Sequence, residues 1–507
     1  MAYLIGIDIG TSGTKVLAID ETGKVAASAS AEYPLLTPRP LWAEQHAEDW
    51  WTATCDCLRR VLATVPPTDI AGIGLSGQMH GLVMLDEKHG VLRPAILWCD
   101  QRTQAQCDWI TETVGMETLV AETANPVLTG FTAPKIIWAR DNEPHLYKQA
   151  RMFLLPKDYI RWKLTGEFAT EVSDASGTSL LNVPERRWSD VVLAKLEIPS
   201  EHLPRVYESY EVSGQISEVG ATATGLRQGT PVVGGGGDQA AGAVGNGIVQ
   251  SGIISVTTGT SGVVFAFADK PTVDPALRVH TFCHAVPNKW HVMGVMLSAG
   301  GSLRWYRDTL CPAEKHVADL MDIDPYDLIA REASTAPAGS EGLVFLPYLT
   351  GERTPYPDPH ARGAFVGLTV RHTKAHLARA VLEGVAFGLR DSLEILKSMN
   401  VSIGNVRASG GGARSELWRQ IQADVFCFPL STINADEGPA LGVALLAGVG
   451  AGLYNSVEEA CSTVIKSISR TEVAVANAEI YEKYYGVYRS LYPALREPFR
   501  TIGQLVE

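Results

Sequence analysis

The sequence predicts an α/β protein built from two similar domains that face a central cleft. The turn Gly-Thr-Ser-Gly occurs twice, at Gly10–Gly13 and Gly259–Gly262, each time between two apolar, strand-like runs. The second copy begins 249 residues after the first, close to half of the 507-residue chain. Strand-like and helix-like segments alternate through both halves, which is typical of α/β folds. We therefore expect domains at residues 1–246 and 247–507.

The composition favours an ordinary globular protein and excludes two classes of partner. Apolar residues make up 46% of the chain and charged residues 20%. A net charge of −13 argues against general binding to nucleic acid or to an anionic membrane. The N-terminus lacks the basic region of a signal peptide, and no apolar run reaches membrane-spanning length. Eight cysteines without a Cys-x-x-Cys pair indicate reduced thiols in the cytoplasm.

Further elements can be placed from hydrophobic periodicity and from turn residues. In the first half we expect a helix over 48–62 and strands over 70–75 and 94–98. In the second half we expect a helix over 376–399, a strand over 406–408, a helix from about 415 and a final helix over 473–491. Polar loops follow the strands, and loops at the carboxyl ends of strands line the cleft in such folds.

The first hairpin carries a carboxylate where phosphate would bind. Asp8 lies two residues before the turn, and a carboxylate beside a phosphate loop is repulsive unless a cation lies between them. We interpret Asp8 as a Mg²⁺ ligand; the alternative is a cap of an Asx-type turn. The second hairpin has Thr257 at the equivalent position, which suits one metal per cleft. The other phosphate contacts expected at the two tips are Thr11, Ser12, Thr14, Lys15, Thr258, Gly259 and Thr260, although any of them can instead be a solvated hairpin residue.

Asp238 follows the run Gly234–Gly237 and is the candidate general base. Glycines allow close backbone approach, so this carboxylate can stand in an open cleft. Phosphoryl transfer to an alcohol needs a carboxylate that orients the hydroxyl and accepts its proton. The alternative is an N-cap, because Asp caps helices well. The glycine run is also a candidate hinge between the halves.

Two more loops carry candidate binding residues. Gln78, Met79 and His80 follow the strand over 70–75, where His80 can hydrogen-bond a polyol hydroxyl and Met79 can cover an apolar face of a small substrate. Asp100 has similar standing as a hydroxyl acceptor, although a lone histidine or aspartate is often structural. The turn Gly410–Gly412 suits close approach to an adenosine.

The order of hairpin, glycine run with Asp238, second hairpin and Gly-Gly-Gly turn resembles the FGGY carbohydrate kinases of the actin/hexokinase-like ATPase superfamily, whose domains are ribonuclease H-like. Gly130–Trp138 resembles one signature of that family, and Gly363–Leu368 with His376–Gly384 resembles the other. Within the family, the loop Gly77–Gly81 resembles the substrate loop of members that phosphorylate D-xylulose to D-xylulose 5-phosphate. The likeness covers residues 3 to about 490.

The resemblance implies an ATP- and Mg²⁺-dependent ketose kinase with Asp238 as the proton acceptor and Asp8 important for activity. It places Met79, His80, Asp238 and Gln239 at the sugar, and it places Thr260, Gly300, Gly411, Gly412 and Ser415 toward ATP. Some relatives have Asn where this chain has Gln239, and Asn where it has Cys99, which bears on the choice of sugar. A homodimer is common in the family.

Three rival functions stay open from sequence. The first is a non-catalytic or chaperone-like ATPase on the same fold, and the second is a sugar sensor that has lost catalysis. The third is a kinase for another ketose or polyol, such as ribulose or a deoxy sugar. Retention of both Asp8 and Asp238 argues against the sensor.

Overall fold

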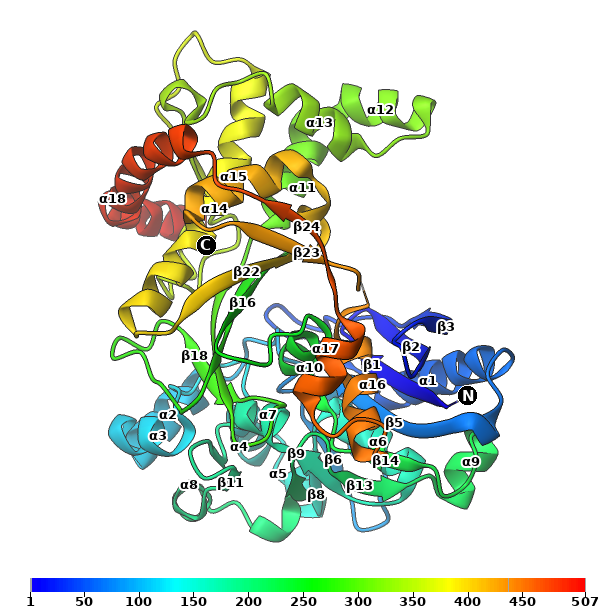
Figure 1. Cartoon of the computed structure of the whole chain (residues 1–507). Coiled ribbons are helices and arrows are strands. Elements are labelled where there is room, and N and C mark those ends of the chain that lie inside the picture. The colour runs from blue at the N-terminus through cyan, green and yellow to red at the C-terminus, as the bar shows by residue number, and fades with distance from the viewer. Residues whose placement is uncertain (1, 436, 507) are drawn as a thin grey trace.

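The computed structural model describes residues 2–435 and 437–506 as two lobes, each built on a seven-stranded sheet (Figure 1). Within these residues, no helix has both the length and the apolarity of a membrane span. The lobes meet along the middle of the molecule, and the first hairpin belongs to one sheet and the second hairpin to the other.

The first sheet has the order β13-β14-β5-β1-β2-β3, with β15 paired to β5. Its strands are β1 (Tyr3–Ile9), β2 (Gly13–Asp20), β3 (Val25–Glu32), β5 (Ile70–Gly77), β13 (Val212–Gln215), β14 (Pro231–Val233) and β15 (Gly236–Gly237). The second sheet has the order β18-β19-β17-β16-β22-β23-β24. Its strands are β16 (Gly252–Thr258), β17 (Gly262–Ala268), β18 (His280–Cys283), β19 (Trp290–Met296), β22 (Ile403–Ser409), β23 (Leu430–Ile433) and β24 (Ser467–Thr471).

The two sheets correspond in order over six strands each, and β15 and β18 are additions to this common pattern. In the first, β1 pairs antiparallel with β2 and parallel with β5; in the second, β16 pairs antiparallel with β17 and parallel with β22. The outer strands agree as well, because β3 and β19 extend the hairpins while β14 and β23 extend the parallel side. The prediction of two similar α/β domains is confirmed.

Amphipathic helices cover the sheets as the periodicity predicts. Helix α1 (Ala47–Leu62) packs on β2 and β3 with Trp50 and Leu58 fully buried. Its counterpart α14 (Lys374–Ser398) packs on β17 and β19. The predicted strand over 94–98 is only β7 (Ala95–Ile96), and the final helix α18 (Val475–Val506) is longer than expected.

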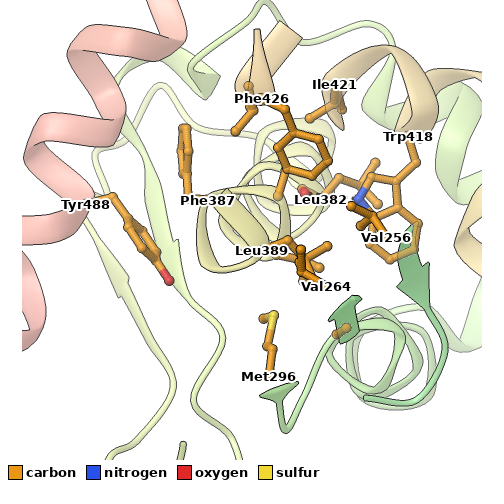
Figure 2. Close-up of a cluster of buried hydrophobic side chains, with 14 of the residues drawn as sticks. Val256, Val264, Met296, Leu382, Phe387, Leu389, Trp418, Ile421, Phe426 and Tyr488 are labelled. Atoms are coloured by element: carbon orange, nitrogen blue, oxygen red, sulfur yellow. Dashed lines mark hydrogen bonds between the residues drawn. The ribbon is translucent and has the colours of Figure 1, made fainter. Parts of the chain in front are cut away.

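The core of the second lobe lies between its sheet and α14, α18 and α15 (Glu416–Phe426). Figure 2 shows Val256 and Val264 of the sheet with Leu382 and Leu389 of α14, all buried. Each such side chain contributes about 1.5–3 kcal/mol relative to an exposed position. This packing fixes the second hairpin relative to α14.

Two helices from the second half of the chain lie with the first lobe. Helix α16 (Gly438–Gly450) comes from the second half of the chain but packs on β1 and β5 of the first sheet, beside α10 (Asp238–Gly245) (Figure 1). The helices touch closely, because a Cβ on Gly442 would lie 1.8 Å from the Ala241 carbonyl oxygen. The predicted boundary between residues 246 and 247 therefore describes chain order, while α16 and α17 (Val457–Val464) lie spatially with the first lobe.

The remaining elements flank these sheets. In the first half they are β4 (Glu44–Gln45), β6 (Val83–Leu85), α2 (Gln104–Val114), α3 (Met116–Thr123), α4 (Thr132–Asn142), α5 (Pro144–Gln149), β8 (Met152–Leu154), α6 (Pro156–Thr165), β9 (Ala169–Glu171), α7 (Val172–Ala175), β10 (Leu181–Asn182), β11 (Arg187–Trp188), α8 (Asp190–Leu196), β12 (Arg205–Tyr207) and α9 (Glu218–Thr224). In the second half they are α11 (Gly300–Leu310), α12 (Pro312–Met321), α13 (Pro325–Ala333), β20 (Val344–Leu346) and β21 (Ala364–Val366).

Candidate active site

Three parallel strands of the first sheet end at one place. Asp8 of β1 pairs with Ser76 of β5, and Gly77 of β5 pairs with Gly237 of β15. The chain leaving β5 carries Met79 and His80, and the chain leaving β15 carries Asp238. Because the carboxyl ends of parallel strands share one edge of a sheet, residues that are far apart in sequence meet here.

The glycine run positions Asp238 but is not a hinge. Residues 234–237 are buried, and β15 is hydrogen-bonded into the first sheet. Gly235 has a φ of 72°, and a Cβ there would lie 1.9 Å from the Leu75 carbonyl oxygen. The hinge prediction is wrong, because these glycines allow the chain to press against β5. The N-cap alternative for Asp238 is also wrong, because Gly237 is the N-cap of α10 and Asp238 is its first helical residue.

Both carboxyl groups have a raised pKa, and the charge of Asp8 contributes to the shift of Asp238. Burial and then the negative charge of Asp8 raise the pKa of Asp238 to about 7, and hydrogen bonds from Gln239 oppose the rise. Burial raises the pKa of Asp8 to about 6, opposed by Ser76 and Lys15. A carboxylate with a pKa near neutrality is suited to accept a proton.

The surroundings of Asp8 fit a bound cation. Its Oδ1 atom is buried without a hydrogen-bond partner, which is costly for a carboxylate oxygen. The Asx-turn alternative is wrong, because Asp8 lies within β1 and pairs in register with Lys15. No group of three or more His, Cys, Asp or Glu among the described residues could hold a metal. A cation here would therefore take its other oxygens from water and phosphate, as Mg²⁺ commonly does.

His80 is held from several sides. Its Nδ1 lies 2.7 Å from the Gly177 carbonyl oxygen, and its ring stacks on Phe131 with centroids 4.7 Å apart. Burial, assisted by the charge of Lys135, lowers the pKa of His80 well below its usual value, so the ring is neutral. Because a carbonyl only accepts, Nδ1 carries the proton and Nε2 keeps a lone pair. Nε2 can thus accept a hydrogen bond from a hydroxyl.

A cavity of about 250 Å³ opens beside Asp238 between the lobes. It is lined by Asp238 and Gln239 of α10 and by Thr257, Val263 and Ser409 of the second sheet, among others. Met79 is buried against Gly237, the residue before Asp238. The predicted residues Met79, Gln239 and Asp238 are therefore brought together.

Two predicted substrate residues are engaged elsewhere. Asp100 is fully buried. Its Oδ2 accepts hydrogen bonds from the Ala43 amide at 2.7 Å and from Arg102 Nη2 at 2.7 Å, and its Oδ1 accepts one from the Arg102 amide at 3.0 Å. The assignment of Asp100 to the sugar is wrong, because both carboxylate oxygens are used inside the fold. Gln78 is buried as well and hydrogen-bonds Gln45 and Thr11, so it supports the first hairpin.

The tip of the first hairpin is ordered by such contacts. Thr11 Oγ1 accepts a hydrogen bond from Trp98 Nε1 at 2.9 Å, and Ser12 is exposed. Thr14 is 1% exposed, so our prediction that it contacts phosphate is wrong: it faces the interior from β2. Lys15 forms an ion pair with Glu437, which precedes α16, and so links the two halves of the chain.

The second hairpin borders a larger cavity of about 400 Å³. All seven residues expected toward ATP on this side line it, namely Thr258, Gly259, Thr260, Gly300, Gly411, Gly412 and Ser415. The N-terminus of α11 holds the hairpin tip, because the Gly300 amide donates to the Gly259 carbonyl oxygen at 2.7 Å. Ser415 caps α15 by accepting from the Trp418 amide. Helix N-termini and glycine turns suit phosphate and adenosine.

Sequence reasoning missed several lining residues. Arg304 donates to Thr260 Oγ1 at 3.1 Å, and Tyr326 and Asp327 of α13 form another wall of the same cavity. Arg353 lies close enough to His80 and His280 for its charge to lower the pKa of both. One signal in the sequence could have identified Arg304: it is a charged residue one helical turn after Gly300.

The paired lobes, with two carboxylates at one sheet and a glycine-lined cavity at the other, define a phosphotransferase of the actin/hexokinase-like class. The sequence profile of the FGGY family of carbohydrate kinases, N-terminal domain, matches residues 3–245, and that of its C-terminal domain matches residues 254–451. The chain belongs to the FGGY family of carbohydrate kinases.

Named relatives agree with this assignment over nearly the whole chain. The xylulose kinase of Escherichia coli K12 is 40% identical, with 99% of this chain and 98% of the relative covered. The xylulose kinase of Bacillus subtilis is 38% identical, with 97% of each covered. A crystal structure described as a "xyloylose kinase" from Brucella ovis is 39% identical, with a TM-score of 0.89 and coverage of 98% and 99%.

Proposed function

We propose that this kinase transfers the γ-phosphoryl group of ATP to the terminal hydroxyl of D-xylulose, giving ADP and D-xylulose 5-phosphate. The observation that carries the proposal is that β5 and β15 end side by side, so the segments carrying His80 and Asp238 leave the same edge of the sheet, and a cavity between the lobes opens beside Asp238. The identity to relatives named xylulose kinase supports the choice of sugar.

Asp238 is the proton acceptor in this proposal. Its carboxylate orients the hydroxyl and takes its proton as the oxygen attacks phosphorus, which is typically worth about 10²–10⁴ in rate. His80 accepts a hydrogen bond at Nε2 from a second hydroxyl, and Met79 covers an apolar face of the sugar. Gln239, next to Asp238, donates to the acceptor or keeps Asp238 in place.

Asp8 is the residue that would hold Mg²⁺. When bound, that cation neutralises charge on the phosphates. The second hairpin, the N-terminus of α11 and the Gly410–Gly412 turn bind the nucleotide, with Thr11, Ser12 and Lys15 facing the phosphates from the first lobe. Closure of the lobes excludes water, a competing nucleophile in the same site. We also propose a cytoplasmic enzyme, which fits eight unpaired cysteines, and a homodimer.

An ADP-release assay with a panel of acceptors tests this function. D-xylulose should give the largest kcat/KM, ahead of D-ribulose, gluconate and glycerol, and release without an acceptor should be low. A higher kcat/KM for another acceptor would make that compound the substrate and would leave the family assignment unchanged. ADP release independent of every acceptor would instead support the non-sugar ATPase.

Asp238→Asn tests the base. The variant keeps the size of the side chain but cannot accept the proton, so kcat should fall by about 10³-fold or more while sugar binding is partly kept. Glu21→Gln, on an exposed turn of the same lobe, is the control. Turnover of Asp238→Asn close to that of the wild type would remove Asp238 from the mechanism.

A further inference from the structure

The backbone of His80 is strained, and the structure contains a device that holds it. His80 has a φ of 68°, in the left-handed region that side chains other than Gly, Asn and Asp rarely occupy. This conformation turns the chain after β5 so that the imidazole reaches Gly177. Such strain persists only where surrounding contacts determine it.

Those contacts converge on the His80 carbonyl oxygen. It accepts from Lys135 Nζ at 2.8 Å and from Thr132 Oγ1 at 3.1 Å, both on α4. The same Lys135 ammonium donates to the Gly130 carbonyl oxygen at 2.7 Å. One buried cation thus ties the substrate loop to the start of the helix that follows Phe131.

A lysine at position 135 is energetically costly, because its ammonium is buried. Its side chain is 0% exposed, and burial lowers its pKa to about 7 against the opposing charge of Asp100. A buried ammonium costs free energy unless it is well hydrogen-bonded, and a methionine would fill the same space without that cost. Stability alone therefore does not explain a lysine here.

We propose that Lys135 is a positioning residue for the acceptor site: it holds the left-handed backbone of His80 so that imidazole Nε2 faces the sugar. Thr132 supports the same carbonyl more weakly, because a neutral donor makes a weaker hydrogen bond than a charged one. The inference rests on the proposed role of His80. Lys135 lies in the segment Gly130–Trp138, which resembles a family signature, and it takes no part in the proposed reaction itself.

Lys135→Met is the first test, in steady-state kinetics with D-xylulose or whichever acceptor the panel selects. The acceptor KM should rise about 10–100-fold, as expected for loss of a charge-assisted hydrogen bond. The KM for ATP and the melting temperature should stay unchanged, or the melting temperature should rise. An acceptor KM within about twofold of the wild type would overturn the inference.

Lys195→Met is the matched control. Lys195 also donates from Nζ to a backbone carbonyl, that of Val114 at 2.8 Å, but it lies on α8 away from the site. Its acceptor KM should equal that of the wild type. If Lys135→Met does not fold, Thr132→Val removes one donor to the same carbonyl and should raise the acceptor KM by about threefold or more; no change would overturn the inference.

A double-mutant cycle separates positioning from general structural support. His80→Ala alone should raise the acceptor KM, and adding Lys135→Met to it should change the KM by less than about threefold, because the ring to be positioned is gone. Full multiplication of the two effects would show that Lys135 acts elsewhere. If His80→Ala leaves the wild-type KM unchanged, the proposed role of His80 fails instead, which distinguishes the two failures.

Discussion

The two glycine-tipped hairpins have the same architecture and opposite chemistry. In the first lobe Asp8 pairs in register with Ser76, and in the second Thr257 pairs with Ser409, where the two hydroxyls lie 2.8 Å apart. One position therefore carries a carboxylate in the first copy and a neutral hydroxyl in the second. The next parallel strand leads to His80 in one lobe and to the glycine turn Gly410–Gly412 beside the larger cavity in the other.

This difference teaches how a duplicated scaffold divides one reaction. At the ends of the hairpin sheets, the carboxylates with pKa values raised toward neutrality, Asp8 and Asp238, lie in the first lobe. The second lobe presents amides, glycines and hydroxyls, which approach a polyanion without repelling it. In the function that we propose, proton transfer and cation binding thus belong to one copy, and nucleotide binding belongs mainly to the other.

Among exchanges between the two hairpins, the largest effect is expected when the first hairpin is made to match the second. Asp8→Thr removes the carboxylate that would hold Mg²⁺, and loss of one such electrostatic group typically costs about 10²–10³ in kcat. The dependence of rate on Mg²⁺ concentration should shift with it, as measured by metal titration of ADP release. A variant with an unchanged metal titration would contradict the role of Asp8.

The reverse substitution, in the second hairpin, tests the same difference. Thr257→Asp places a carboxylate beside the second hairpin, where like-charge repulsion should raise the KM for ATP by about 10–100-fold. Thr257→Val, which loses only the hydrogen bond to Ser409, is the control and should change the KM for ATP by less than about threefold. Equal effects of the two variants would show that charge is unimportant there.

Two alanine substitutions sharpen the account of the second lobe. A Cβ on Gly300 would lie 2.5 Å from the Gly259 carbonyl oxygen, so Gly300→Ala should displace the hairpin tip and raise the KM for ATP by about tenfold. A Cβ on Gly411 meets nothing within 4 Å, so Gly411→Ala should leave stability unchanged. A smaller rise in the KM for ATP, about threefold, would come from crowding of the nucleotide itself. An unchanged KM in Gly411→Ala would place the nucleotide away from this turn.

The smallest effect concerns pH and stability. Folding raises the pKa of Asp238 to about 7, so the folded state favours the protonated carboxyl. The contribution of Asp238 to the free energy of unfolding is therefore lost as pH rises through 7. Asp238→Asn should therefore be more stable than the wild type by about 1–3 kcal/mol at pH 8, with the difference vanishing near pH 4. Urea unfolding at the two pH values measures this. In the wild type, kcat/KM should fall below about pH 7, because the base must be ionised.

Much of the fold and site follows from local signals. The repeated turn predicted paired domains, the periodicity of Val381, Val385 and Leu389 predicted α14, and the glycine run marked Asp238. Asp100 was predicted incorrectly because its partner Ala43 lies 57 positions earlier in the chain. Thr14 was predicted incorrectly because the register of β2, and not its nearness to the turn, decides which way it faces.

The sequence by itself determined the duplicated α/β scaffold, the family and the carboxylates Asp8 and Asp238, because turns, periodicity and motifs are encoded by neighbouring residues. Only the tertiary structure decided that α16 crosses to the first lobe, that Asp8 raises the pKa of Asp238, and that Lys135 donates a hydrogen bond to the His80 carbonyl oxygen. These features depend on contacts between distant segments, and packing and burial create such contacts only when the chain is folded.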